Sequence, residues 1–192
     1  SIKNQSKNGT VKEALRLGCA AVGFTIYPGS DYQYDMIEEF KEISFEASES
    51  GLPSVLWSYP RGPNIDKESE TSIDTIAYAA HIAALLGAHI IKVKPPSSSV
   101  TNSELKKQYS EFFSNIDSLS ERIKHIKKSA FNSKKLVVFS GGNAKGTQEM
   151  LEEIEQIKNG GGNGSIIGRN TFQRPRAEAL QLLQSVINIY KK

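Results

Sequence analysis

The chain has 192 residues, of which 38% are hydrophobic and 23% are charged. These values are ordinary for one globular domain with a substantial core, and they exclude a disordered or collagen-like chain. The formal net charge of +3 is small, and basic residues alternate with acidic ones instead of forming a stripe, which argues against a nucleic-acid-binding protein. Anionic small molecules stay open as ligands.

The single cysteine, Cys19, has no partner for an internal disulfide, and it lies in an apolar run where we expect a buried structural thiol. A reducing compartment fits this expectation. No apolar run approaches the roughly 20 residues needed to cross a bilayer, and the first residues carry no signal-peptide core. The sequence therefore predicts a cytoplasmic protein that does not enter a membrane.

Five short apolar runs, mostly rich in β-branched residues, punctuate the chain. They cover residues 20–26, 54–59, 89–94, 136–139 and 165–167, and they are typical of buried parallel strands. The segments between them have helical periodicity, so strand and helix alternate strictly.

Start and stop signals mark the helices. Three pairs have the spacing of a capping box: Thr10 with Glu13, Ser30 with Gln33, and Thr101 with Glu104. Three glycines are expected to end helices: Gly18, Gly51 and Gly87. Pro175 suits the first turn of the last helix.

Two stretches have unusual composition. Residues 97–133 are rich in serine and lysine, yet apolar side chains recur there every three or four residues, which predicts an amphipathic helix over a core. The glycine-rich residues 160–164 follow a helix and precede a strand. A phosphate-binding loop has the opposite order, so we interpret this run as a flexible turn at the non-catalytic end.

Strands separated by helices are built either as an open doubly wound sheet or as a (β/α)8 barrel. Polar or glycine-rich residues follow every predicted strand, and in barrels those strand ends meet at one mouth. No Gly-x-Gly-x-x-Gly run follows an early strand, as a dinucleotide-binding fold would require. The predicted fold is therefore α/β, a TIM barrel, with residues 1–192 in a single domain.

Lys92 lies inside the predicted strand 89–94, where a charged amine is rarely placed without a use. Burial and a nearby cation favour the neutral, nucleophilic amine, and Lys94 lies on the same strand face two residues later. We expect each lysine to lower the pKa of the other. The alternative is that one lysine extends to solvent and the other pairs with an acid.

Further candidates lie at neighbouring strand ends. Tyr59 precedes a Pro-Arg-Gly run, where its phenol can act as an acid or base near a Schiff base, whereas Trp57 by itself suits an ordinary core aromatic. The last two strands end in polar loops, the place where barrels commonly bind phosphate. The candidate phosphate-binding residues are Ser140, Gly141, Gly142, Gly168 and Arg169.

Five runs also carry a family resemblance: AVGFTIYPGS at residues 21–30, VLWSYPRG at 55–62, IIKVK at 90–94, SGG at 140–142 and IIGRNTFQRP at 166–175. They resemble the archaeal and bacterial class I fructose-bisphosphate aldolases of the DhnA/DeoC type over nearly the whole chain. The resemblance implies a Schiff base on Lys92 and proton transfer by Tyr59. It also implies that the two glycine-containing loops hold the C1 phosphate of a ketose.

The resemblance departs at the beginning of the chain. A complete barrel has about 250 residues and eight strands, whereas five strands are predicted here. We therefore expect the last five strands and their helices, without three N-terminal strands. An open barrel exposes two sheet edges, so additional chain or a homo-oligomer is expected.

The resemblance therefore implies metal-independent, cofactor-free and reversible cleavage of fructose 1,6-bisphosphate to dihydroxyacetone phosphate and glyceraldehyde 3-phosphate, as in glycolysis and gluconeogenesis. Trp57 and Lys94 are expected to contact the substrate. The three histidines are scattered, so no metal site is predicted: His81, His89 and His125. The alternatives are a related Schiff-base lyase or thiolase acting on another phosphorylated ketose, and a truncated inactive barrel that binds or oligomerises.

Overall fold

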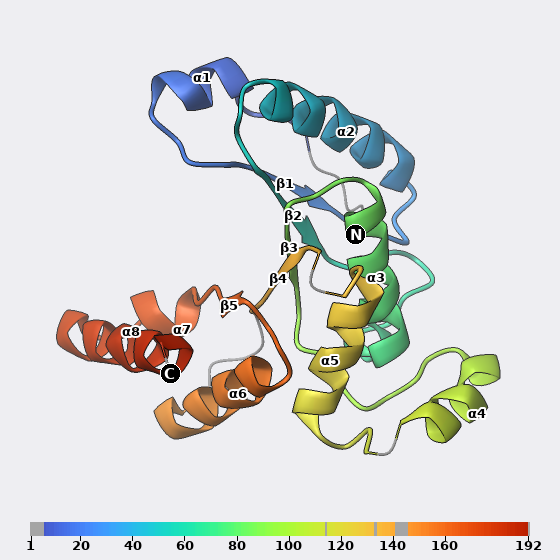
Figure 1. Cartoon of the computed structure of the whole chain (residues 1–192). Coiled ribbons are helices and arrows are strands. Elements are labelled where there is room, and N and C mark those ends of the chain that lie inside the picture. Colours follow the sequence, from blue (N-terminus) through green and yellow to red (C-terminus); the bar gives the residue numbers. More distant parts are fainter. Residues whose placement is uncertain (1–5, 114, 133, 141–145, 192) are drawn as a thin grey trace.

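A computed structural model describes residues 6–113, 115–132, 134–140 and 146–191 of the chain. Its core is a parallel sheet with the strand order β1-β2-β3-β4-β5 (Figure 1). The strands are β1 (Val22–Ile26), β2 (Ser54–Ser58), β3 (Ile90–Val93), β4 (Leu136–Phe139) and β5 (Gly164–Ser165). Each strand pairs with its neighbour in sequence, so the predicted succession of five parallel strands is confirmed.

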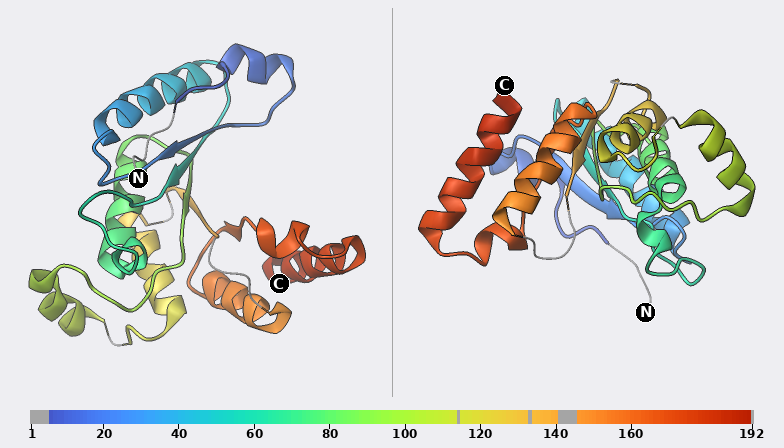
Figure 2. Two further views of the ribbon diagram at one scale, coloured as in Figure 1. Left: turned by 180° about the vertical axis from the view of Figure 1, so that it is seen from behind. Right: turned by 90° about the horizontal axis from the view of Figure 1, so that it is seen from below.

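Helices connect all the strands, and further helices lie before β1 and after β5 (Figure 2). They are α1 (Val11–Arg16), α2 (Gln33–Glu49), the 3-10 helix η1 (Ser69–Thr71), α3 (Ile73–Leu85), α4 (Ser103–Phe112), α5 (Leu119–Ser129), α6 (Thr147–Asn159), α7 (Arg169–Phe172) and α8 (Arg176–Lys191). None of the helices in the described part of the chain is both long enough and apolar enough to cross a membrane.

One face of the sheet is covered by helices and carries the main core, and Lys92 points to the other face. Phe24, Leu56, Ile91 and Val137 point to the helix-covered face and are buried in the main core. Successive strand side chains alternate between faces, so Lys92 points to the opposite face. In a closed barrel that opposite face is the interior, and the chemistry of a barrel lies at its carboxyl edge.

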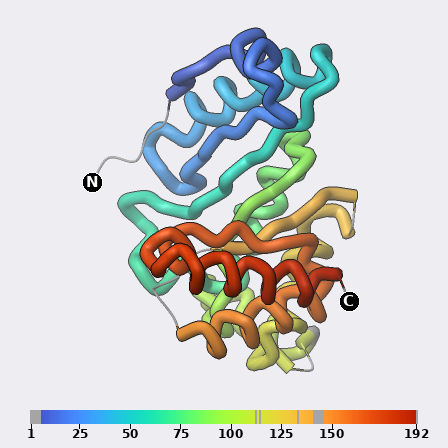
Figure 3. Tube along the Cα trace, turned by 90° about the vertical axis from the view of Figure 1, so that its left-hand side faces the viewer, coloured from blue at the N-terminus to red at the C-terminus, as the bar shows by residue number. Residues whose placement is uncertain are grey.

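A second, smaller core joins the last helices. It consists of Met150 and Ile154 from α6 and Leu182, Val186 and Ile189 from α8. Helix α8 lies along α6 at this contact (Figure 3). The apolar periodicity of α8 is therefore satisfied by a neighbouring helix, and not by the sheet alone.

The amphipathic stretch predicted over residues 97–133 is two helices, α4 and α5. Phe113 ends α4 with an extended backbone, and the side chain of Asn115 accepts a hydrogen bond from the Ser118 N–H at 3.3 Å. Phe113 and Tyr109 stack with ring centroids 5.5 Å apart, and both contact the ring of His125. The periodicity survives the break because both helices turn their apolar sides toward each other and the core.

The helix ends match the sequence prediction in part. Thr10 and Glu13 form the predicted capping box, and the three predicted terminating glycines each have positive φ, at Gly18, Gly51 and Gly87. The Ser30 and Gln33 pair instead forms a turn before α2, in which the Gln33 side chain accepts the Gly29 N–H at 3.1 Å.

Two further predictions from the sequence are wrong. Asn102, and not Thr101, caps α4, because Thr101 is held by Asp74 and the Ser72 hydroxyl. Cys19 is exposed, and not buried. It lies in the turn that ends α1, since β1 begins only at Val22.

The glycine-rich run at residues 160–164 lies between α6 and β5, which agrees with its interpretation as a turn at the non-catalytic end. Gly161 has a φ of +84°, a conformation that favours glycine. Asn163 ties this turn to β4, because its side chain accepts the Val137 N–H at 2.9 Å.

Candidate active site

Lys92 projects from β3 onto the sheet face opposite the main core, and it is only 6% exposed. Its Nζ donates a hydrogen bond to the phenolic oxygen of Tyr59, which directly follows β2. Trp57 is paired with Lys92 in the register of β2 and β3. Parallel pairing therefore brings the amine and the phenol together at the carboxyl edge of the sheet.

Burial lowers the pKa of Lys92 from 10.5 to about 8. A lysine with this pKa is neutral in about one molecule in ten at pH 7, far more often than an exposed lysine. The Nζ also lies 5.8 Å from the Trp57 ring centroid and 5.0 Å from that of Tyr59. Aromatic faces attract cations, so they can stabilise a positive charge on this nitrogen.

Tyr59 is held from both sides. Burial raises the pKa of its phenol, while a side-chain hydrogen bond with Ser140 and the nearby Arg61 cation act in the opposite direction. The Tyr59 N–H donates to the Ile26 carbonyl at 3.1 Å, and the Arg61 N–H donates to the Pro28 carbonyl at 3.0 Å. The phenol is thus protonated at neutral pH and fixed beside the amine, as a proton donor must be.

A cavity of about 280 Å³ opens beside this pair. Its lining includes five residues that the sequence singled out: Tyr59, Lys92, Ser140, Gly168 and Arg169. Helix α6 contributes Glu153 together with apolar side chains. The cavity therefore combines a buried amine, a phenol and an arginine at the ends of parallel strands.

The remaining predicted site residues lie elsewhere. Trp57 contacts the Lys92 amine from β2 without lining the cavity. Lys94 follows β3, and its Nζ pairs with Glu70 at 2.7 Å. Gly141 and Gly142 lie outside the described residues.

The expected mutual effect of the two lysines is wrong for Lys92. Burial is the cause of its lowered pKa, and Lys94 contributes nothing resolvable. The alternative prediction is met by one lysine, since Lys94 pairs with an acid. Lys92 does not extend to solvent.

Two residues near the site were assigned no role from the sequence. Arg61 lies 5.5 Å over the Tyr27 ring and 5.9 Å over the Tyr59 ring, and its Nε is buried without a hydrogen-bond partner among the described residues. Its place after Tyr59 in the Pro-Arg-Gly run was the available signal. Glu70 comes from η1, far from any strand, and no spacing in the sequence points to it.

A metal centre is not formed by the described residues, in which no three or more His, Cys, Asp or Glu side chains are grouped to hold an ion. The histidines serve other contacts. His89 Nδ1 bonds the Ser54 N–H at 3.1 Å, His81 Nδ1 lies 2.9 Å from the Ser129 carbonyl, and His125 Nε2 lies 3.0 Å from the Tyr109 hydroxyl.

Five consecutive parallel βα units define the class of fold, a (β/α) barrel of which this chain contains a part. The chain belongs to the DeoC/LacD family of aldolases, whose pattern matches residues 2–174.

Two relatives of known name are similar to this chain in sequence. The chain is 35% identical over 181 residues to the class 1 fructose-bisphosphate aldolase of Halobacterium salinarum, covering 94% of this chain and 59% of that protein. It is 34% identical to the fructose-bisphosphate aldolase/6-deoxy-5-ketofructose 1-phosphate synthase of Methanocaldococcus jannaschii, covering 93% and 51% respectively. The chain thus spans between half and three-fifths of the length of these relatives.

The fold of this chain is also similar to a solved structure. An archaeal fructose-1,6-bisphosphate aldolase, with its catalytic lysine bound to the carbinolamine intermediate of the substrate, superposes with a TM-score of 0.77 at 31% sequence identity. The match covers 96% of this chain and 63% of that one. Five of eight βα units are about the same share, which agrees with the partial barrel expected from the sequence.

Proposed function

We propose that this chain carries the Schiff-base centre of a class I aldolase that cleaves fructose 1,6-bisphosphate reversibly. The observation that supports this best is the Lys92 amine, buried with a pKa of about 8 and hydrogen-bonded to Tyr59 beside a cavity. The names of the aldolase relatives point to the same substrate.

In the proposed reaction, neutral Lys92 attacks the C2 ketone of the sugar and forms a carbinolamine. Tyr59 donates its proton as the carbinolamine hydroxyl leaves as water, and a protonated imine results. The faces of Trp57 and Tyr59 stabilise this cation. The imine is the electron sink that C3–C4 cleavage requires.

Cleavage then uses the tyrosine in the opposite direction. The phenolate of Tyr59 accepts the proton of the C4 hydroxyl, the C3–C4 bond breaks, and glyceraldehyde 3-phosphate leaves. The bonding electrons form an enamine at C3, which takes the proton back from Tyr59. Hydrolysis of the imine releases dihydroxyacetone phosphate and restores Lys92.

Phosphate recognition is assigned to the ends of β4 and β5, whose residues also line the cavity. Arg169 and Gly168 line it after β5, and Ser140 lines it after β4. A guanidinium binds phosphate with two parallel hydrogen bonds. We include Gly141 and Gly142 in this proposal on the resemblance alone.

The test is trapping with cyanoborohydride in the presence of dihydroxyacetone phosphate, followed by peptide mass mapping. The expected result is one adduct, on Lys92. Lys127 is the internal control, because it is equally buried at 6% exposed but lies away from the cavity. An unmodified Lys92 in folded protein would reject the Schiff-base role and favour an inactive binding module.

A second substrate assignment has one specific support, since the Methanocaldococcus jannaschii relative is named for two activities on phosphorylated ketoses. A Schiff-base lyase on a different phosphorylated ketose would use the same Lys92 chemistry. A substrate panel with trapped adducts separates the two assignments, because the preferred ketose gives the fastest adduct formation.

A further inference from the structure

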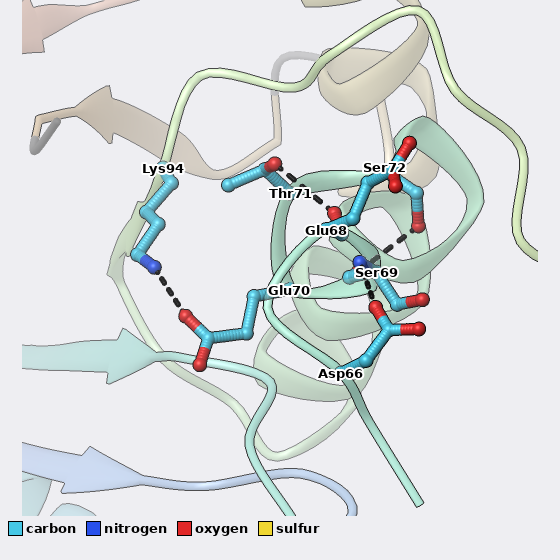
Figure 4. A network of polar contacts seen from close by, with 7 residues as sticks. All are labelled: Asp66, Glu68, Ser69, Glu70, Thr71, Ser72 and Lys94. Atoms are coloured by element: carbon cyan, nitrogen blue, oxygen red, sulfur yellow. Dashed lines mark hydrogen bonds and ion pairs between the residues drawn. The ribbon is translucent and has the colours of Figure 1, made fainter.

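Lys94 and Lys92 lie two residues apart at the end of β3, on the same face of the sheet. The Lys94 ammonium donates a hydrogen bond to the Glu70 carboxylate at 2.7 Å (Figure 4). The two side chains of this pair are only 22% and 18% exposed. Because it is partly buried, this pair is screened by salt less than an ordinary surface ion pair.

The position of Glu70 is set by its own turn. The Asp66 carboxylate accepts the Ser69 N–H at 2.7 Å, and the Glu70 N–H donates to the Asp66 carbonyl at 3.1 Å. The Thr71 carbonyl accepts both the N–H and the hydroxyl of Ser97, at 2.7 and 3.1 Å. The bonds between Ser97 and Thr71 hold η1 against the loop after β3. The Glu70 carboxylate is therefore fixed in position, and the Lys94 side chain extends to it (Figure 4).

Glu70 is an anion in this setting. Burial acts to raise the pKa of its carboxyl, but the hydrogen bond from Lys94 and the charges of Lys94, Arg61 and Lys67 lower it overall. The charge of Glu70 therefore offsets that of Lys94, the cation that follows Lys92 after β3.

Other charged or titratable groups face Lys92 from the elements around the cavity. They are Tyr59 after β2, Arg61 behind the Tyr59 ring, Glu153 on α6 and Arg169 at the start of α7. None of them lies on the strand of Lys92, and the substitutions below leave all of them in place. Substitution of Lys94 therefore changes the charge next to β3 while these other groups stay unchanged.

We propose that Glu70 is a positioning residue that acts on Lys92 through Lys94, by holding the Lys94 ammonium at the rim and offsetting its charge. The role rests on the proposed Schiff-base function of Lys92. Without Glu70, the bare ammonium is free to turn toward the cavity. The unpaired Lys94 cation, two residues along the chain from Lys92, then disfavours protonation of Lys92. We expect it to lower the pKa of Lys92 by about one unit, with solvent screening allowed for.

The test measures the ionisation of Lys92 directly and needs no ketose. Acetic anhydride labels neutral amines in competition, and mass mapping of the Lys92 peptide at each pH gives its midpoint. The full chain is compared as wild type, Glu70→Gln, Lys94→Met and the double variant. Glu68→Gln is the matched control, since Glu68 is an exposed acid on the same turn.

The expected shifts have opposite signs. Glu70→Gln lowers the midpoint by about one unit, because it leaves an uncompensated cation. Lys94→Met raises it, because it leaves an uncompensated carboxylate. The double variant returns near the wild-type midpoint, and Glu68→Gln does not move it. A merely structural role would lower the labelling of all variants without opposite shifts.

Unchanged midpoints in both single variants, or shifts of one sign, would overturn the proposal. If Glu70→Gln disturbs the turn, as circular dichroism would show, Lys94→Met carries the test, because the methionine keeps the apolar stem. Opposite shifts without any ketose adduct would support the positioning role and reject the proposed function. A ketose adduct without these shifts would support the proposed function and reject the positioning role of Glu70.

Discussion

Two buried lysines lie in different regions of this molecule. Lys92 and Lys127 are each 6% exposed, and burial lowers the pKa of both. Lys127, on α5, donates to the Lys135 carbonyl at 3.1 Å and to the Asn163 side chain, so two acceptors close around it near the start of β4 and β5. Lys92 meets a single phenol and a cavity at the opposite edge of the sheet.

The comparison shows that burial alone does not mark a reactive lysine. Lys127 joins a helix to the turn before β5, so its amine is committed to structure. The amine of Lys92 has room beside it for a ligand. This contrast follows the division of a (β/α) barrel into a stabilising end and a catalytic end.

The largest effect should come from replacing each lysine in turn. Lys92→Met removes the proposed nucleophile, so we expect no trapped adduct with dihydroxyacetone phosphate. Lys127→Met should leave adduct formation within about twofold of wild type, since Lys127 does not line the cavity. An adduct that persists in Lys92→Met would end the contrast between the two lysines.

The phenol next to Lys92 gives the next largest effect. Tyr59→Phe keeps the ring beneath the amine but removes the proton donor, so we expect imine formation and turnover to slow by about 10²- to 10⁴-fold. Single-turnover trapping measures the rate of imine formation, and a coupled assay of the product measures turnover. Equal rates in wild type and variant would assign the proton transfer to another group.

The pH dependence should separate Lys92 from an ordinary lysine. Because burial lowers its pKa to about 8, the neutral fraction rises about tenfold per pH unit below that value and levels off above it. Adduct formation should follow the same curve. In the urea-unfolded chain the labelling of the same peptide should rise up to about pH 10.4, and a matching curve for the folded protein would show that burial does not tune the amine.

The smallest effect concerns stability at the other end. Asn163→Ala removes the acceptor shared by Lys127 and the Val137 N–H, and we expect a loss of roughly 1–3 kcal/mol in the free energy of unfolding. Asn163→Asp keeps an acceptor oxygen and should lose much less. Urea titration measures both, and the labelling midpoint of Lys92 should not change in either variant.

Much of the fold was readable because it depends on local patterns. Apolar runs of strand length predicted all five strands, although β5 is only two residues long, and the Ile166 N–H still donates to Phe139. The errors fall where tertiary contacts compete with local propensity. Thr101 has the spacing of a capping residue, yet Asp74 and Ser72 hold it elsewhere.

By itself the sequence determined which residue types stand at the strand ends: an amine inside an apolar strand, a phenol before Pro-Arg-Gly and an arginine after the last strand. Strand periodicity and parallel pairing then fix the edge where they meet. Only the tertiary structure decided what each lysine contacts. The partner of Lys94 is a glutamate in a distant turn, and the pKa of Lys92 is set by its surroundings, because charge and burial depend on neighbours in space and not in sequence.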